Sequence, residues 1–171
     1  MKKRGWFLAI ALLLALCVAG YAGRWELARR EIARKFPSVP HLTTAQLAAE
    51  LGSPRAPLLL DIRTRAEFEV SHLAGARHVE PESDLSSLPV GKETPIVTYC
   101  SVGYRSAAFA ARLQKAGYTH VRNLEGSIFQ WANEGRSLVR DGRRTDKVHP
   151  YNRVWGRLLN PQYRADLPPT R

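Results

Sequence analysis

The sequence predicts an α/β fold in which a parallel sheet is flanked by helices on both sides. Short apolar runs rich in β-branched residues alternate along the chain with segments of helix-forming residues. Strands that alternate with helices in this way form parallel sheets whose two faces are covered. The composition, 44% hydrophobic and 24% charged, is that of a globular protein.

The expected elements follow from these runs and from the Gly and Pro residues between them. In chain order they are a helix at 25–36, a helix at 45–51, a strand at 56–63, a helix at 64–71, a strand at 76–79, a loop with one helical turn at 81–91, a strand at 95–99, a helix at 105–116, a strand at 120–124 and a helix at 127–135.

Two helix starts carry capping signals. Thr64 and Glu67 have the spacing of a capping box, in which each side chain bonds the backbone N–H of the other residue. Thr43 or Thr44 is expected to cap the helix that ends at Gly52.

The first residues predict a membrane segment. Lys2, Lys3 and Arg4 precede an uncharged apolar run at residues 6–23, which as a helix would be roughly 27 Å long, enough to cross a bilayer core. The pattern favours an uncleaved N-terminal transmembrane helix in a bacterial-type inner membrane, with the domain on the periplasmic side. Secretion after cleavage of a signal peptide is the alternative.

Charge divides the chain into three parts: an anchor and stalk at 1–36, a central domain at 37–136 and a basic extension at 137–171. Residues 1–36 carry eight Lys and Arg against two Glu, whereas residues 37–134 carry nine against ten Asp and Glu. A nearly neutral domain between basic flanks argues against nucleic-acid binding and fits an anionic membrane surface better, with a solvated basic tail as the alternative. In the extension, Trp155 is expected to lie at a membrane interface or on the domain itself.

The stretch PIVTYCSVGYRS at 95–106 holds the candidate site. It predicts a buried strand, a short turn that begins at Cys100, and a helix that starts near Arg105. A cysteine at a helix N-terminus is favoured as the thiolate. Gly103 permits the bend of the loop, whose backbone N–H groups are expected to form a nest for an anion, and Arg105 and Ser106 add a charge and a hydroxyl.

A second polar group is expected near this turn. Asp61 and Cys100 both follow strands, and the carboxyl ends of parallel strands meet at one edge. Asp61 is nevertheless expected to be structural, and Arg63 is expected to pair with Glu67. Two histidines without a third ligand predict no metal site.

The spacing of the loop distinguishes two covalent chemistries. A cysteine phosphatase places five residues between its cysteine and arginine, but only four residues separate Cys100 from Arg105. The smaller loop suits one additional sulfur atom on the cysteine better than a phosphate group. Tyr99 also stands where a tyrosine-phosphatase-like motif has histidine.

Together, three ordered motifs make the chain resemble the single-domain rhodaneses, a family of sulfurtransferases. They are DIRTRAEFEVSHLAGARHV, CSVGYRS and LEGSIFQWANEG, within residues 41–136. The resemblance implies a rhodanese-like α/β fold and a rhodanese-type enzyme in which Cys100 carries sulfane sulfur as a persulfide. The loop residues that would bind the persulfide are Ser101, Val102, Gly103, Tyr104 and Arg105, supported by Asp61, Arg63 and Ser106.

The resemblance further implies no cofactor, a donor such as thiosulfate or a persulfide, and a thiol or cyanide as acceptor. Two departures stand out. The family often has a second glycine where this chain has Ser127 after Gly126, and the loop lacks a basic residue directly after Cys100, which weighs against thiosulfate. A rhodanese-fold binding module without activity and a cysteine phosphatase are the alternative functions.

Overall fold

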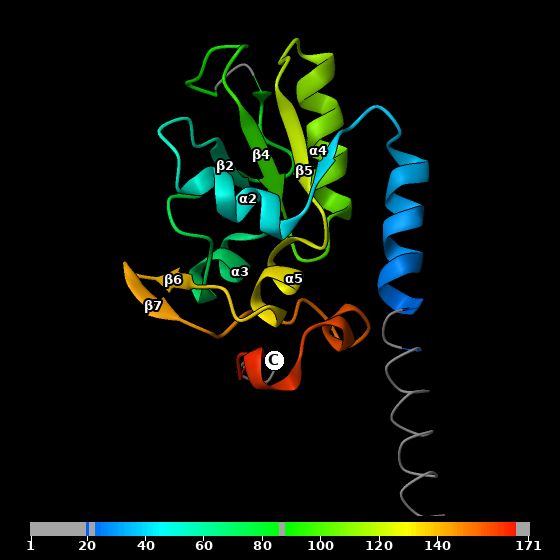
Figure 1. Ribbon diagram of the computed structural model, residues 1–171, viewed down its shortest axis with the longest axis vertical. Coiled ribbons are helices and arrows are strands. Elements are labelled where there is room, and N and C mark those ends of the chain that lie inside the picture. Colours follow the sequence, from blue (N-terminus) through cyan, green and yellow to red (C-terminus); the bar gives the residue numbers. More distant parts are fainter. Residues whose placement is uncertain (1–19, 21–22, 86–87, 167–171) are drawn as a thin grey trace, which may run out of the picture.

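The computed structural model describes residue 20 and residues 23–85 and 88–166. Its centre is a five-stranded sheet with the strand order β1-β5-β4-β2-β3 (Figure 1). Every pairing in this sheet is parallel, which confirms the expected α/β fold. The strands are β1 (His41–Leu42), β2 (Leu58–Asp61), β3 (Arg77–His78), β4 (Ile96–Tyr99) and β5 (Val121–Leu124).

Helices cover both faces of the sheet. On one face, Phe109 of α4 packs in a cluster with Leu60, and on the other, Leu47 of α2 and Ile128 of α5 pack in a cluster with Leu59. Because adjacent residues of a strand point to opposite faces, Leu59 and Leu60 serve the two clusters. The helices are α2 (Thr44–Leu51), α3 (Arg65–Val70), α4 (Tyr104–Lys115) and α5 (Ser127–Asn133).

The predicted caps are present. Thr64 and Glu67 form the capping box that starts α3, and Thr43 forms another with Gln46 at the start of α2. These caps satisfy backbone N–H groups that lack partners in the first turn of a helix. They also fix where α3 begins, directly after β2, at the edge of the sheet where Cys100 lies.

The expected stalk is helical at residues 23–35, but it packs on the domain (blue in Figure 1). Trp25 and Ile32 are 3% and 6% exposed, and Trp25 belongs to the core cluster on the α5 face. Arg29 adds an ion pair with Glu125, with an N–O distance of 3.2 Å. The helix is therefore an integral part of the folded domain.

The C-terminal extension also packs on the domain. It contains the antiparallel hairpin of β6 (Leu138–Arg140) and β7 (Arg143–Thr145), then two short 3-10 helices, η2 (Trp155–Leu158) and η3 (Pro161–Tyr163). Leu158 and Leu159 are buried in the core cluster of the α5 face. Asn133, the last residue of α5, donates from Nδ2 to the carbonyl of Leu158 at 2.7 Å.

Within the described residues, no helix has both the length and the apolar character needed to cross a membrane. The apolar run at 6–23, in which the sequence predicts an N-terminal transmembrane helix, lies almost wholly outside the described residues.

Candidate functional site

Cys100 lies directly after β4, with its side chain in a tight turn. The residue is only 1% exposed, and the backbone N–H of Gly103 donates to Sγ at 3.2 Å. Gly103 has φ of 114° and is the N-cap of α4, a backbone conformation that glycine adopts at little steric cost. The turn thus places the sulfur beside the N-terminus of α4, where the helix dipole favours negative charge.

Arg105 is held in place by Glu67 of α3. Its Nη1 and Nη2 atoms donate to the two carboxylate oxygens of Glu67, both at 2.8 Å. Ser101 joins the pair, since its hydroxyl donates to Glu67 at 2.8 Å and accepts from Arg105 Nη2 at 3.0 Å. Three residues from two segments therefore form one charged network beside Cys100.

The network sets the charge states of its members. Burial alone would raise the pKa of Glu67, but the hydrogen bonds and charge of Arg105, with bonds from Thr64 and Ser101, lower it to about 2. Burial alone would lower the pKa of Arg105, but the bonds from Glu67 and the charge of a Cys100 thiolate raise it further above its usual value. Both side chains stay ionised near neutral pH.

The expected pairing of Arg63 with Glu67 is wrong. Arg63 instead binds Asp61, with Nη2 2.6 Å from Oδ2, and both side chains are fully buried. The same Nη2 donates to the carbonyl of Ser71 at 2.6 Å. Arg63 precedes the cap of α3 and turns into the core, so helical spacing does not govern its partner.

Ser106 acts on the loop through Asn123, a residue that sequence reasoning missed. The Ser106 hydroxyl donates to Oδ1 of Asn123 at 2.7 Å, and Nδ2 of Asn123 donates to the carbonyl of Gly103 at 3.2 Å. Asn123 lies in β5, whose neighbour is β4, so the contact follows from strand order. The pair fastens the end of the loop to the sheet.

Ser127 is a second residue that the sequence noted only as a departure. Its φ is 50°, in the left-handed region where glycine is usual. Its hydroxyl accepts the backbone N–H of Cys100 at 3.1 Å and donates to the carbonyl of Leu124 at 3.0 Å. The N–H groups of Ile128 and Phe129 then bind the carbonyls of Cys100 and Ser101, so the start of α5 fixes the loop.

A cavity of about 280 Å³ opens above the cysteine. Five of its lining residues come from the loop and the start of α4, and two come from the C-terminal extension, a contribution that sequence reasoning missed. The lining residues are Cys100, Ser101, Val102, Tyr104, Arg105, Tyr151 and Trp155.

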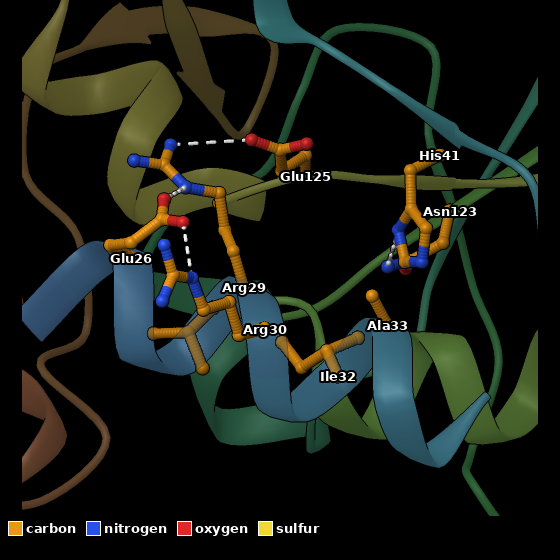
Figure 2. A pocket seen from close by; sticks show the side chains of 10 residues that line it. Glu26, Arg29, Arg30, Ile32, Ala33, His41, Asn123 and Glu125 are labelled. Carbon is orange, nitrogen blue, oxygen red and sulfur yellow. Dashed lines mark hydrogen bonds and ion pairs between the residues drawn. The ribbon is translucent and has the colours of Figure 1, made fainter. Parts of the chain in front are cut away.

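A larger cavity of about 460 Å³ lies between the N-terminal helix and the sheet. Figure 2 shows its charged groups paired with one another: Arg29 with Glu125 and Arg30 with Glu26. Cys100 does not line it. The smaller cavity is therefore the one that gives access to the candidate nucleophile.

In the part of the chain that the structure describes, no cluster of three or more His, Cys, Asp and Glu residues is arranged to hold a metal ion. What the site offers instead is one thiol, a backbone N–H aimed at it, and a neighbouring guanidinium. That set can support nucleophilic attack by sulfur and can stabilise an anionic sulfur.

A model of the rhodanese-like domain matches residues 43–134. The chain belongs to the rhodanese-like domain family. The matched part includes the Cys100 loop, both capping boxes and α5, whereas the N-terminal helix and the whole C-terminal extension lie outside it.

Among curated proteins, the chain is similar to a probable adenylyltransferase/sulfurtransferase, MoeZ, of Mycobacterium tuberculosis, with 33% identity over 54% of this chain and 24% of that protein. It is also similar to a tRNA uridine(34) hydroxylase of Erwinia tasmaniensis, with 30% identity over 56% of this chain and 29% of that protein. The chain thus spans about a quarter of the length of these relatives.

Solved structures give the same family. The rhodanese-like domain of an Anabaena protein matches with a TM-score of 0.55 and 26% identity, over 60% of this chain and 80% of that one. A thiosulfate sulfurtransferase of Pseudomonas aeruginosa matches with a TM-score of 0.51 and 30% identity, over 60% of this chain and 20% of that one.

Proposed function

We propose that the protein is a sulfurtransferase that carries sulfane sulfur as a persulfide on Cys100. The observation that supports this most directly is the geometry at the sulfur: Sγ accepts the Gly103 N–H at 3.2 Å and faces a cavity lined by Arg105. A sulfur atom added to Sγ would enter this cavity beside the guanidinium. Relatives of the chain include proteins named as sulfurtransferases.

The reaction is an exchange in two steps. The Cys100 thiolate attacks the outer sulfur of a donor, the donor's S–S bond breaks, and the remainder leaves with the bonding electrons, as sulfite from thiosulfate or as a thiolate from an organic persulfide. An acceptor thiolate or cyanide then attacks the outer sulfur of the Cys100 persulfide. Cys100 leaves as the thiolate, and no external oxidant or reductant is consumed.

The site supports this chemistry better than phosphoryl transfer. Only four residues lie between Cys100 and Arg105, and the guanidinium is already bound on both outer nitrogens by Glu67. A phosphatase needs its arginine to hold phosphate oxygens. A binding module without activity would not require a thiol at the position where the Gly103 N–H donates to Sγ.

Intact-mass analysis tests the proposal. The chain should be purified in full, because Trp25 and Ile32 pack in the domain, and a Cys17→Ser background leaves Cys100 as its one thiol. After incubation with polysulfide or thiosulfate, we expect a gain of about 32 Da, one sulfur atom, that reductant reverses and that Cys100→Ala abolishes. No gain with either donor would refute the sulfurtransferase and favour the binding module.

We also propose that residues 6–23 anchor the protein in a bacterial inner membrane, with the domain on the periplasmic side. Three exposed apolar side chains, Leu27, Val154 and Trp155, lie around one groove together with Arg24 and Arg157. Arg24 directly follows the apolar run, so this surface would lie close to the bilayer. Membrane fractionation with protease accessibility tests this; release into the soluble fraction with a cleaved N-terminus would favour secretion instead.

A further inference from the structure

Three aromatic side chains line the Cys100 cavity, and we name them the aromatic collar: Tyr104, Tyr151 and Trp155. They are 40%, 42% and 38% exposed, so each ring presents part of its surface to an incoming molecule. Tyr151 and Trp155 belong to the C-terminal extension, beyond the residues 43–134 that match the family. Two of the three collar residues therefore come from this chain's own extension, and Tyr104 comes from the start of α4.

The extension holds these two rings in defined positions. The Tyr151 ring lies over Arg105, with 4.5 Å between the guanidinium carbon and the ring centroid, a cation–π contact. The backbone N–H of Trp155 donates to Oδ1 of Asn152 at 2.9 Å. Leu158 and Leu159 follow Trp155 by three and four residues and are buried in the core cluster of the α5 face. Their burial holds this segment against α5.

Charge at the cavity does not favour a small anion. Among the residues that line it, Arg105 is the only cation, and Glu67 binds both of its outer nitrogens at 2.8 Å. The pair is close to neutral as a unit, so a doubly charged donor such as thiosulfate meets little uncompensated positive charge. The other residues that line the cavity are mostly aromatic or aliphatic, and they favour contact with an apolar group of a substrate.

We propose that the aromatic collar selects organic thiols and persulfides whose sulfur is attached to an apolar, preferably aromatic, group. This rests on the proposed function and names the substrate class of the same site. In the first step, the Cys100 thiolate and R–S–SH give the Cys100 persulfide and R–S⁻. In the second, the protonated persulfide and an acceptor R′–S⁻ give the Cys100 thiolate and R′–S–SH. The R groups occupy the collar in both steps.

The test is single-turnover transfer from the full chain, loaded with polysulfide and verified by mass, to two thiols of similar basicity. One is benzyl mercaptan, which carries a phenyl ring, and the other is 2-mercaptoethanol, which does not. We expect the second-order rate constant for benzyl mercaptan to be larger by about tenfold, because ring stacking and apolar burial are available only to it.

Variants assign that preference to the collar. Tyr151→Ala and Trp155→Ala should each lower the ratio of the two rate constants toward one, whereas Tyr151→Phe and Trp155→Phe keep a ring and should retain most of it. Val154→Ala is the matched control, because Val154 precedes Trp155, is 70% exposed and does not line the cavity. Its ratio should equal that of the wild type.

Two results would overturn the inference: a ratio near one in the wild-type protein, or an unchanged ratio in both alanine variants that load sulfur normally. Failure of the proposed function looks different, because no sulfur would then appear on Cys100 during loading. If one alanine variant does not fold, the other alanine variant and the wild-type ratio still decide the question.

Discussion

Glu67 of α3 and Arg105 of α4 bind each other through two hydrogen bonds of 2.8 Å across a sequence separation of 38 residues. Glu67 also accepts the N–H of Thr64 as part of the capping box that starts α3. One carboxylate therefore fixes both the start of one helix and the first turn of another. The Cys100 loop lies between β4 and that first turn.

Glu67→Gln should destabilise the protein and slow the loading of Cys100. The change removes the charge that compensates Arg105, and removing one partner of a buried pair costs about 3–5 kcal/mol, which the 23% exposure of the Arg105 side chain moves toward the lower end. Urea unfolding measures the first effect, and the rate of sulfur uptake by mass measures the second. Glu69→Gln is the control on the same helix, since Glu69 is exposed. Equal behaviour of the two variants would show that the pair contributes nothing.

The same pair predicts a pH dependence of stability. The pKa of Glu67 is about 2 in the folded protein and about 4.3 in an unfolded chain. A lowered folded pKa means that this contribution is fully present above about pH 4.3 and is lost as the pH falls toward 2. It amounts to about 3 kcal/mol. The difference in unfolding free energy between wild type and Glu67→Gln should therefore shrink across this range; a constant difference would contradict the assignment.

Ser127→Ala should impair the site more than Ser127→Gly. Both variants remove the hydroxyl that accepts the Cys100 N–H at 3.1 Å, and leaving a buried N–H without a partner costs about 1–3 kcal/mol. The glycine variant should be more stable than the alanine variant by about 1 kcal/mol, because a backbone φ of 50° strains a residue with a Cβ but not glycine. Thermal unfolding and the rate of sulfur loading should rank wild type, glycine and alanine in that order, and a fully active alanine variant would count against this role.

Much of the core of this fold could be predicted from sequence because the signals are local. β4 is a short run of β-branched and aromatic residues, IVTY, and the capping box of α3 needs only Thr64 and Glu67 at the right spacing. β1 is only two residues long, too short for any periodicity, and β6 and β7, with the sequences LVR and RRT, are also too short to show a strand-like pattern. Their positions depend on pairing with distant segments.

The site divides in the same way. Cys100 and Arg105 share one short motif, so their proximity follows from spacing. The partner of Arg105 is set by how α3 and α4 pack, and the sequence wrongly suggested Arg63 as the partner of Glu67. Tyr151 reaches the cavity only because Leu158 and Leu159 dock on the α5 face, a tertiary contact that no local pattern records.

Gly126→Ala should be strongly destabilising. Gly126 has φ of 67°, and a Cβ there would lie 2.5 Å from Cβ of Gln130, so steric overlap adds to backbone strain. We expect a loss of more than about 2 kcal/mol in unfolding free energy. Gly117→Ala is the matched control: its φ is 89° but a Cβ would meet nothing within 4 Å, so strain alone should cost about 1 kcal/mol. Similar losses in both would show that the overlap is relieved by movement of α5.

Removal of the N-terminal helix should loosen the Cys100 loop. A Cβ built on Gly103 would lie 3.5 Å from Cδ1 of Ile32, and a Cβ built on Gly126 would lie 3.4 Å from Cζ3 of Trp25. The N-terminal helix therefore packs against both of the glycines that precede α4 and α5. A chain beginning at residue 37 should therefore unfold at lower urea concentration and load sulfur more slowly than one beginning at residue 23.

Two point variants test the same packing. Ile32→Ala should lower the free energy of unfolding by about 2 kcal/mol, whereas Leu27→Ala, at a residue that is 69% exposed, should change it little. If the chain from residue 37 matches the chain from residue 23 in both measurements, the helix serves only to connect the domain to what precedes it.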